Sequence, residues 1–107
     1  MRLIFLSIVA GCVGLSGVTM AEDRISDAAY WRTAQCAGLA EGTGQDARAY
    51  TVLLSRQSVG RNAFVLDRAD ELRREARVRA KRAKGFDAAQ IVARLNGSDC
   101  SALTPRG

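Results

Sequence analysis

Apolar residues recur at steps of three and four along residues 62–84, which is the most regular pattern in the chain. This spacing places them on one stripe of an α-helix. The stripe consists of Val65, Ala69, Leu72, Ala76 and either Ala80 or Ala83. Acidic residues gather early in the stretch and basic residues late, an order that suits the helix dipole. The pattern predicts a helix over 62–84, and we expect the rest of the chain to be arranged around it.

Two shorter helical stretches precede this segment. Ser26 or Asp27 is a suitable N-cap for the first, and the glycines that follow predict its end near residue 41. The second begins near Asp46 and carries a short apolar stripe. Its stripe consists of Ala49 or Tyr50, Leu53, Leu54 and Gln57.

Gly60 interrupts the pattern between the second stretch and the helix over 62–84. A helix with a bend at Gly60 and two helices with a corner there are both compatible with this position. Two helices are favoured, because Asn62 is a suitable cap for a new helix. An unbroken helix from Asp46 to residue 84 would also exceed the usual length in globular proteins.

A last helix is predicted after Gly85, with Asp87 as its cap and Asn96–Gly97 as its end. Ile91 and Leu95 are expected to face inward. Phe86 is expected to fold back onto the apolar stripe of the preceding helix. No stretch alternates apolar and polar residues for long enough to predict a strand. The expected fold is therefore all-α, a small bundle of three or four helices.

Residues 1–21 have the layout of a secretory signal peptide. One basic residue, Arg2, precedes a long uncharged apolar run that stops before Glu22, and Ala21 is a suitable residue at the cleavage site. The run is also about long enough to remain as a membrane anchor. A third interpretation takes Cys12, after a short run of small residues, as the acylated first residue of a lipoprotein. Cleavage after Ala21 is the favoured interpretation, and it leaves a helical domain over 22–107 with a frayed tail over 103–107.

Cleavage would leave two cysteines, Cys36 and Cys100, in the exported chain. An even number of cysteines in an exported protein indicates a disulfide, and two cysteines allow one intramolecular pairing. Closing a loop of this length stabilises a chain by about 4 kcal/mol in the chain-entropy treatment. Since a domain of this size has a small core, we expect the Cys36–Cys100 bond to be structural.

The sequence contains no histidine, which removes the usual general base and the commonest zinc ligand. Neither an enzyme nor a cofactor or metal site is expected. The acidic residues of 62–84 have helical spacing, and we expect ion pairs such as Asp70–Arg74 and Glu75–Arg79 instead of metal binding. No phosphate-binding loop is present.

The chain carries 16 basic and 11 acidic residues, and half of the basic residues lie in Arg68–Lys84. Arginine suits carboxylate and phosphate partners, so Arg73, Arg77 and Arg82 are candidate residues for binding an anion or a partner. A solvated helix face is the competing interpretation and the favoured one. No nucleic-acid motif is visible, and nucleic acid is not an expected partner.

These observations predict a small, exported, non-enzymatic helical protein, periplasmic or secreted, that binds another protein of the cell envelope. The alternative function is binding of an anionic surface or polyanion through the Arg68–Lys84 face. The two differ in their response to salt, because polyanion binding weakens steeply with ionic strength. Membrane association is expected only if Cys12 is lipidated or the leader is retained.

Overall fold

The computed structural model describes residues 23–103, and within them it contains helices and no strand. The helices are α2 (Asp27–Gly42), α3 (Arg48–Gln57), α4 (Ala63–Arg82), α5 (Phe86–Asn96) and the one-turn α6 (Ser98–Ser101). The predicted all-α fold is confirmed, with four main helices and one short turn. The predicted leader 1–21, Cys12 and the tail beyond residue 103 lie outside the described residues. None of the helices within 23–103 has the length and apolar character that a membrane crossing requires.

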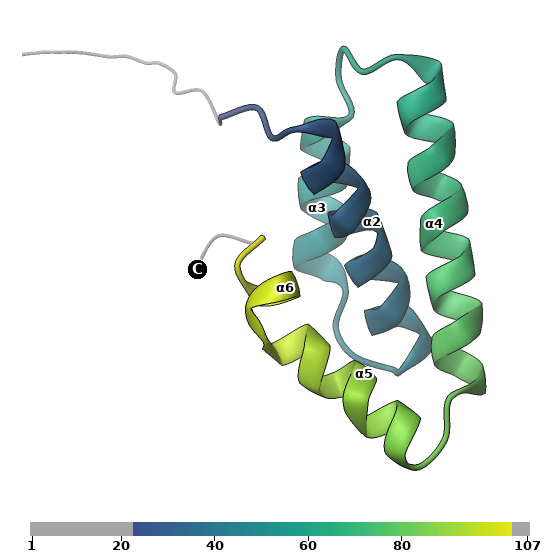
Figure 1. Cartoon of the computed structure of the whole chain (residues 1–107). Coiled ribbons are helices and arrows are strands. Elements are labelled where there is room, and N and C mark those ends of the chain that lie inside the picture. Colours follow the sequence, from purple (N-terminus) through teal and green to yellow (C-terminus); the bar gives the residue numbers. More distant parts are fainter. Residues whose placement is uncertain (1–22, 104–107) are drawn as a thin grey trace, which may run out of the picture.

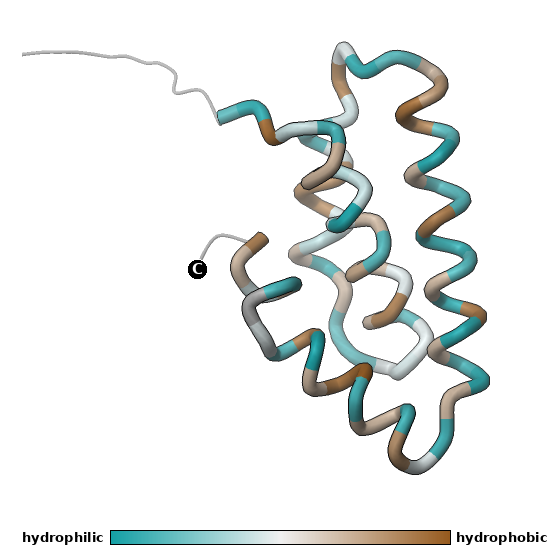
Figure 2. The backbone as a smooth tube through the Cα atoms, viewed as in Figure 1, coloured by the Kyte–Doolittle hydropathy of each residue, from teal (hydrophilic) through white to brown (hydrophobic). Residues whose placement is uncertain are grey.

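Helix α2 lies at the centre of the bundle (Figure 1). It packs most extensively against α4, and α3, α5 and α6 also contact it. The expectation that the chain is arranged around residues 62–84 was therefore wrong. Helix α2 has mostly short side chains and is buried on several sides. Helix α4 buries one stripe and exposes a highly charged face, which appears as hydrophilic bands in Figure 2. The buried residues of α2 are Tyr30, Thr33, Ala34, Cys36, Ala37, Gly38, Leu39 and Ala40.

Small residues bring α2 and α4 into close, parallel contact. A Cβ atom built on Gly38 would lie 2.2 Å from the carbonyl oxygen of Arg73, and one on Gly42 would lie 2.5 Å from the Cβ of Ala80. Both glycines are one helical turn apart on the same face of α2, as Ala76 and Ala80 are on α4. The backbones therefore pack without intervening side chains, as small residues four apart allow.

The predicted corner at Gly60 is confirmed. Helix α3 ends at Gln57, and Gly60 has a φ of 81°, a conformation that side chains disfavour. Asn62 then caps α4, since its side-chain oxygen accepts a hydrogen bond from the Val65 amide at 3.2 Å. Ser26 caps α2 in the same way, accepting from the Ala29 amide at 3.0 Å.

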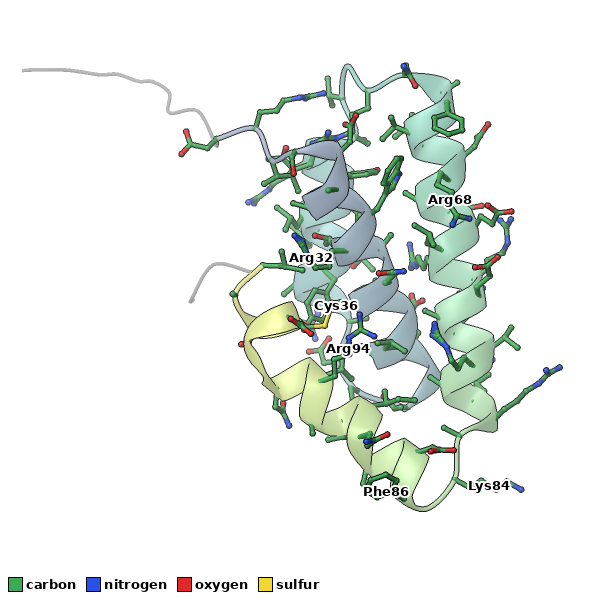
Figure 3. The ribbon with its side chains drawn as sticks, viewed as in Figure 1. Arg32, Cys36, Arg68, Lys84, Phe86 and Arg94 are labelled. Carbon is green, nitrogen blue, oxygen red and sulfur yellow. A yellow bond between two sulfur atoms is a disulfide. The ribbon has the colours of Figure 1, made fainter. Side chains whose placement is uncertain are left out.

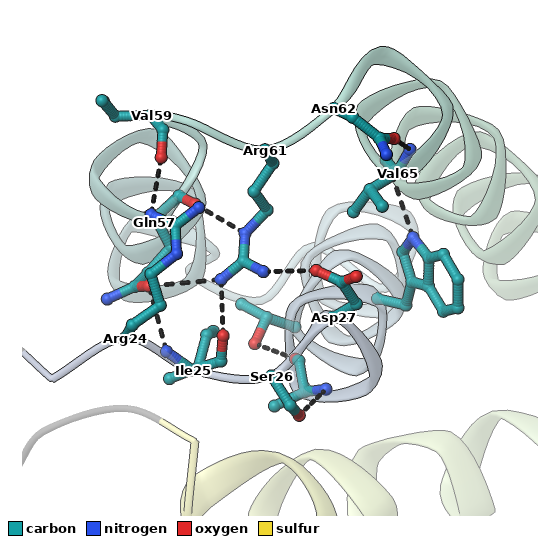
Figure 4. A network of polar contacts seen from close by, with 12 residues as sticks. Arg24, Ile25, Ser26, Asp27, Gln57, Val59, Arg61, Asn62 and Val65 are labelled. Carbon is teal, nitrogen blue, oxygen red and sulfur yellow. Dashed lines mark hydrogen bonds and ion pairs between the residues drawn. The ribbon is translucent and has the colours of Figure 1, made fainter.

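A buried arginine ties this corner to the start of α2 (Figure 4). The Arg61 side chain is only 3% exposed. Its guanidinium donates to the Asp27 carboxylate at 2.6 Å, to the Ile25 carbonyl at 2.7 Å and to the Gln57 carbonyl at 2.7 Å. It also lies 4.6 Å from the centroid of the Tyr30 ring. These contacts satisfy a charge whose burial alone would be costly, so Arg61 is a structural residue.

Helix α5 differs from the prediction at its start. It begins at Phe86 with Gly85 at the cap position, and Asp87 lies within the first turn. The Phe86 side chain is 75% exposed and lies at the tip where α5 turns away from α4, so its predicted return to the apolar stripe was wrong (Figure 3). The reason is that α5 turns back toward α2, so residues later in α5, and not Phe86, contact the core. Leu95 is buried and Ile91 packs against the core, as predicted.

The predicted disulfide between Cys36 and Cys100 is confirmed. The two Cα atoms lie 5.8 Å apart, and both cysteines are completely buried. The bond joins the middle of α2 to the short α6 across 64 residues of sequence. The α5–α6 arm is held to the bundle by this bond together with the buried Leu95 and the half-buried Ile91 and Leu103.

Candidate functional site

An open groove of about 1100 Å³ lies between α4 and α5 and is the candidate site. It is bordered by the second half of α4 and most of α5, and Leu39 of α2 contributes to its floor. The lining combines arginines, two carboxylates and apolar side chains. It consists of Leu39, Arg74, Glu75, Val78, Arg79, Arg82, Ala83, Asp87, Gln90, Ile91 and Arg94. We call this set the α4–α5 groove.

Helical spacing explains why these residues share the groove. Arg74, Val78 and Arg82 are four residues apart, so they form one row along α4. On α5, steps of three and four from Asp87 bring Ile91 and Arg94 to the face toward α4. The two helices join at residues 83–85 and diverge from that turn, with α5 bending toward α2 (Figure 1). The groove is the space that this divergence opens.

The groove combines apolar surface with positive charge. Val78 is 45% exposed and is one of five large hydrophobic side chains that the described residues leave exposed. Arg74 forms an ion pair with Asp70, and Arg94 approaches Asp99 at 3.8 Å. Within the described residues, Arg79 and Arg82 form no ion pair. The groove therefore offers these two guanidinium groups to a ligand, beside the carboxylates of Glu75 and Asp87.

The three arginines predicted as a partner site do not lie together. Arg82 lines the groove, whereas Arg73 and Arg77 turn toward α2 and pair with Glu41. Arg73 binds both carboxylate oxygens of Glu41, with its Nε 3.1 Å from Oε1, and the Nη1 of Arg77 lies 3.3 Å from the same oxygen. Arg73 and Arg77 thus act structurally in this geometry, and a role in binding stays a prediction.

Glu41 is the residue that the sequence interpretation missed. Hydrogen bonding from Arg73 lowers the pKa of the Glu41 carboxyl below its ordinary value of 4.5, against a partial burial that raises it. The pair is 32 residues apart in sequence, so no local spacing reveals it. The only signal was an acidic residue in the last turn of α2, close to the glycines that bring α4 near.

The Glu41→Gln variant is expected to lose about 1–2 kcal/mol of stability at pH 7, since it removes a charged hydrogen-bonding partner of two arginines. Because the folded-state pKa is lowered, this stability is present above the unfolded value of 4.5 and is lost as pH falls through the lower folded value. Urea unfolding at pH 7 and pH 3 should show the gap between wild type and variant closing on acidification. Asp67→Asn, which removes an exposed carboxylate of α4, is the control. A gap of equal size at both pH values would contradict the prediction.

The ion pairs predicted within residues 62–84 are partly present. The Asp70–Arg74 pair is present, and Arg68 pairs with Glu71 at 2.6 Å. The Glu75–Arg79 pair is not among the ion pairs of the described residues, although both side chains line the groove. Over residues 23–103, no group of three or more potential ligand side chains is arranged to hold a metal ion.

Comparisons with protein-family models, curated proteins and solved structures found no match to this chain. The class that the structure itself defines is a small all-α bundle closed by one disulfide. The α4–α5 groove, with its exposed valine and its two arginines without ion pairs in 23–103, is the surface feature from which a function is argued.

Proposed function

We propose that this chain is an exported, non-enzymatic helical protein that binds another protein of the cell envelope through the α4–α5 groove. The observation that carries the proposal is the lining of this groove. An open concave surface places the exposed Val78 beside Arg79 and Arg82, and protein-binding surfaces commonly combine an apolar centre with arginine.

Two features support the exported location. The buried Cys36–Cys100 bond is of the kind that forms and persists in oxidising compartments. The layout of residues 1–21 is typical of a secretory leader. A periplasmic or secreted protein is the location most consistent with both.

A binding role is favoured over catalysis by the residue types in the groove. The sequence has no histidine, so the groove lacks the usual general base, and its carboxylates, Glu75 and Asp87, lie among arginines.

The alternative, binding of a polyanion through the Arg68–Lys84 face, has weaker support. Arg73 and Arg77, two of its three candidate residues, are directed toward Glu41. On the same face, Glu71 pairs with Arg68 and Asp70 pairs with Arg74, which reduces the positive charge that the face offers to a polyanion. These contacts give more support to a protein segment in the groove.

Site-specific photocrosslinking in the native host tests the proposal. A benzophenone amino acid at position 78 is expected to crosslink a discrete envelope protein, since Val78 lies in the groove. The same residue at position 52 is the matched control, because Val52 is 42% exposed and lies on α3, outside the groove lining. The identified partner is then purified and titrated against the Val78→Asp and Val52→Asp variants.

Val78→Asp is expected to weaken binding at least about tenfold, because it places a charge at the apolar centre of the contact, and Val52→Asp is expected to leave affinity unchanged. Equal loss in both variants, or a partner crosslinked only from position 52, would refute the groove as the binding site.

A further inference from the structure

We infer that the partner segment bound in the α4–α5 groove is an acidic amphipathic α-helix, lying with its apolar stripe on Val78 and Ile91 and its carboxylates on Arg79 and Arg82. This inference rests on the proposed function and specifies the chemistry of the ligand. It follows from three properties of the groove: its shape, the position of its apolar residues and the sign of its available charge.

The shape favours a helix as the occupant. Extended peptides are commonly recognised by adding a strand to a sheet edge or by docking in an aromatic-lined groove. The described residues 23–103 contain no strand, and no aromatic residue lines the α4–α5 groove. A space between two diverging helices is instead the geometry in which an amphipathic helix docks. Helix α5 has 11 residues and is about 16 Å long, so the groove accommodates about three turns of a partner helix.

The apolar residues form a path along the groove. Val78 on α4 is 45% exposed, and Ile91 on α5 and Ala83 at the turn are half-buried. A partner helix with apolar residues at steps of three and four would lay this stripe on the path. Covering Val78 removes from water one of the large aliphatic side chains that the bundle leaves exposed.

The groove is lined by four arginines and two carboxylates, Glu75 and Asp87, so the formal charge of its lining is positive and favours acidic flanks on a partner. Arg79 and Arg82 are exposed, and neither forms an ion pair within 23–103. They lie three residues apart on α4, a spacing that glutamates at steps of three or four on a partner helix would match. Guanidinium groups bind carboxylates through paired hydrogen bonds, which fixes the orientation of the partner as well as adding affinity.

Two other occupants fit less well. A lipid surface is flat, whereas these arginines border a concave space. A second copy of this chain carries the same formal charge of +5, so the two copies would repel each other. An acidic segment of a different protein is complementary in both shape and charge.

The test uses the chain recovered from its envelope fraction with the disulfide formed, and a synthetic 18-residue helical peptide. The peptide carries leucine at steps of three and four and glutamate on both flanks. Binding is measured by fluorescence anisotropy of the labelled peptide at physiological salt. Saturable binding is expected for this peptide, with affinity at least about tenfold weaker for a scrambled peptide of the same composition and for a version with lysine in place of glutamate.

Charge reversal gives the decisive comparison. The double variant Arg79→Glu, Arg82→Glu is expected to lose binding to the glutamate peptide at least about tenfold and to gain binding to the lysine peptide. The control Arg48→Glu, Arg68→Glu makes the same change in net charge outside the groove lining and should retain the original preference. Circular dichroism confirms that both variants keep their helical content.

Equal losses in the two double variants, or stronger binding to anionic phosphatidylglycerol vesicles than to the glutamate peptide, would overturn the inference. Failure of the peptide to bind while crosslinking from position 78 still identifies a groove-dependent partner would overturn the acidic helix alone. Failure of the position-78 crosslink would instead count against the proposed function.

Discussion

The Gly38→Ala variant is expected to lose about 3 kcal/mol of unfolding free energy, which is at the upper end of the usual cost of overpacking. The added Cβ would lie 2.2 Å from the Arg73 carbonyl oxygen and 2.9 Å from the Ala76 Cβ. The first of these atoms belongs to the backbone, so relief requires α2 and α4 to move apart. Separation would also disturb the nearby pair between Arg73 and Glu41. Urea unfolding followed by far-UV circular dichroism measures the loss.

The sign of this effect makes it informative. In an exposed helix, replacing glycine with alanine stabilises by about 1 kcal/mol, because alanine has the better helix propensity. A gain of stability in Gly38→Ala would therefore show that α2 and α4 do not touch at this point. The matched control is Gly44→Asn. Gly44 has a φ of 76°, which asparagine tolerates, and no atom within 4 Å of a built Cβ, so its stability should change by less than about 1 kcal/mol.

Removal of the disulfide in a Cys36→Ala, Cys100→Ala variant is expected to destabilise the protein by about 4 kcal/mol, since the closed loop spans 64 residues. The cost comes mainly from the greater conformational freedom of the unfolded chain. Both cysteines are fully buried, and alanine leaves no unsatisfied polar group in their place. Thermal and urea unfolding of the variant and the oxidised wild type provide the comparison.

The loss is also expected to be uneven along the chain. Helix α5 buries Leu95, whereas α4 buries four residues against α2. Amide hydrogen exchange in Phe86–Asn96 should therefore accelerate more than exchange in Ala63–Arg82. Intact-mass measurement before and after reduction confirms the bond in the wild type as a gain of two hydrogens. Equal acceleration in both helices would show that the disulfide does not hold the α5–α6 arm specifically.

The sequence by itself determined which segments are helical and where several of them begin. Hydrogen bonds within a helix and caps such as Ser26 and Asn62 act over three or four residues, so local order reveals them. The corner at Gly60 followed from the same local logic. The pairing of Cys36 with Cys100 was also accessible, because only two cysteines follow the predicted leader.

Only the tertiary structure decided which helix is central, where the arginines point and where the groove lies. These outcomes depend on which helix faces meet, and the helices that meet are far apart in the sequence. Gly38 and Gly42 let α4 approach α2 in a parallel register, and that register places Arg73 and Arg77 on Glu41. Arg82 is left at the groove because it lies beyond this contact. A one-dimensional pattern specifies the faces of each helix, whereas backbone proximity and close packing select which faces meet.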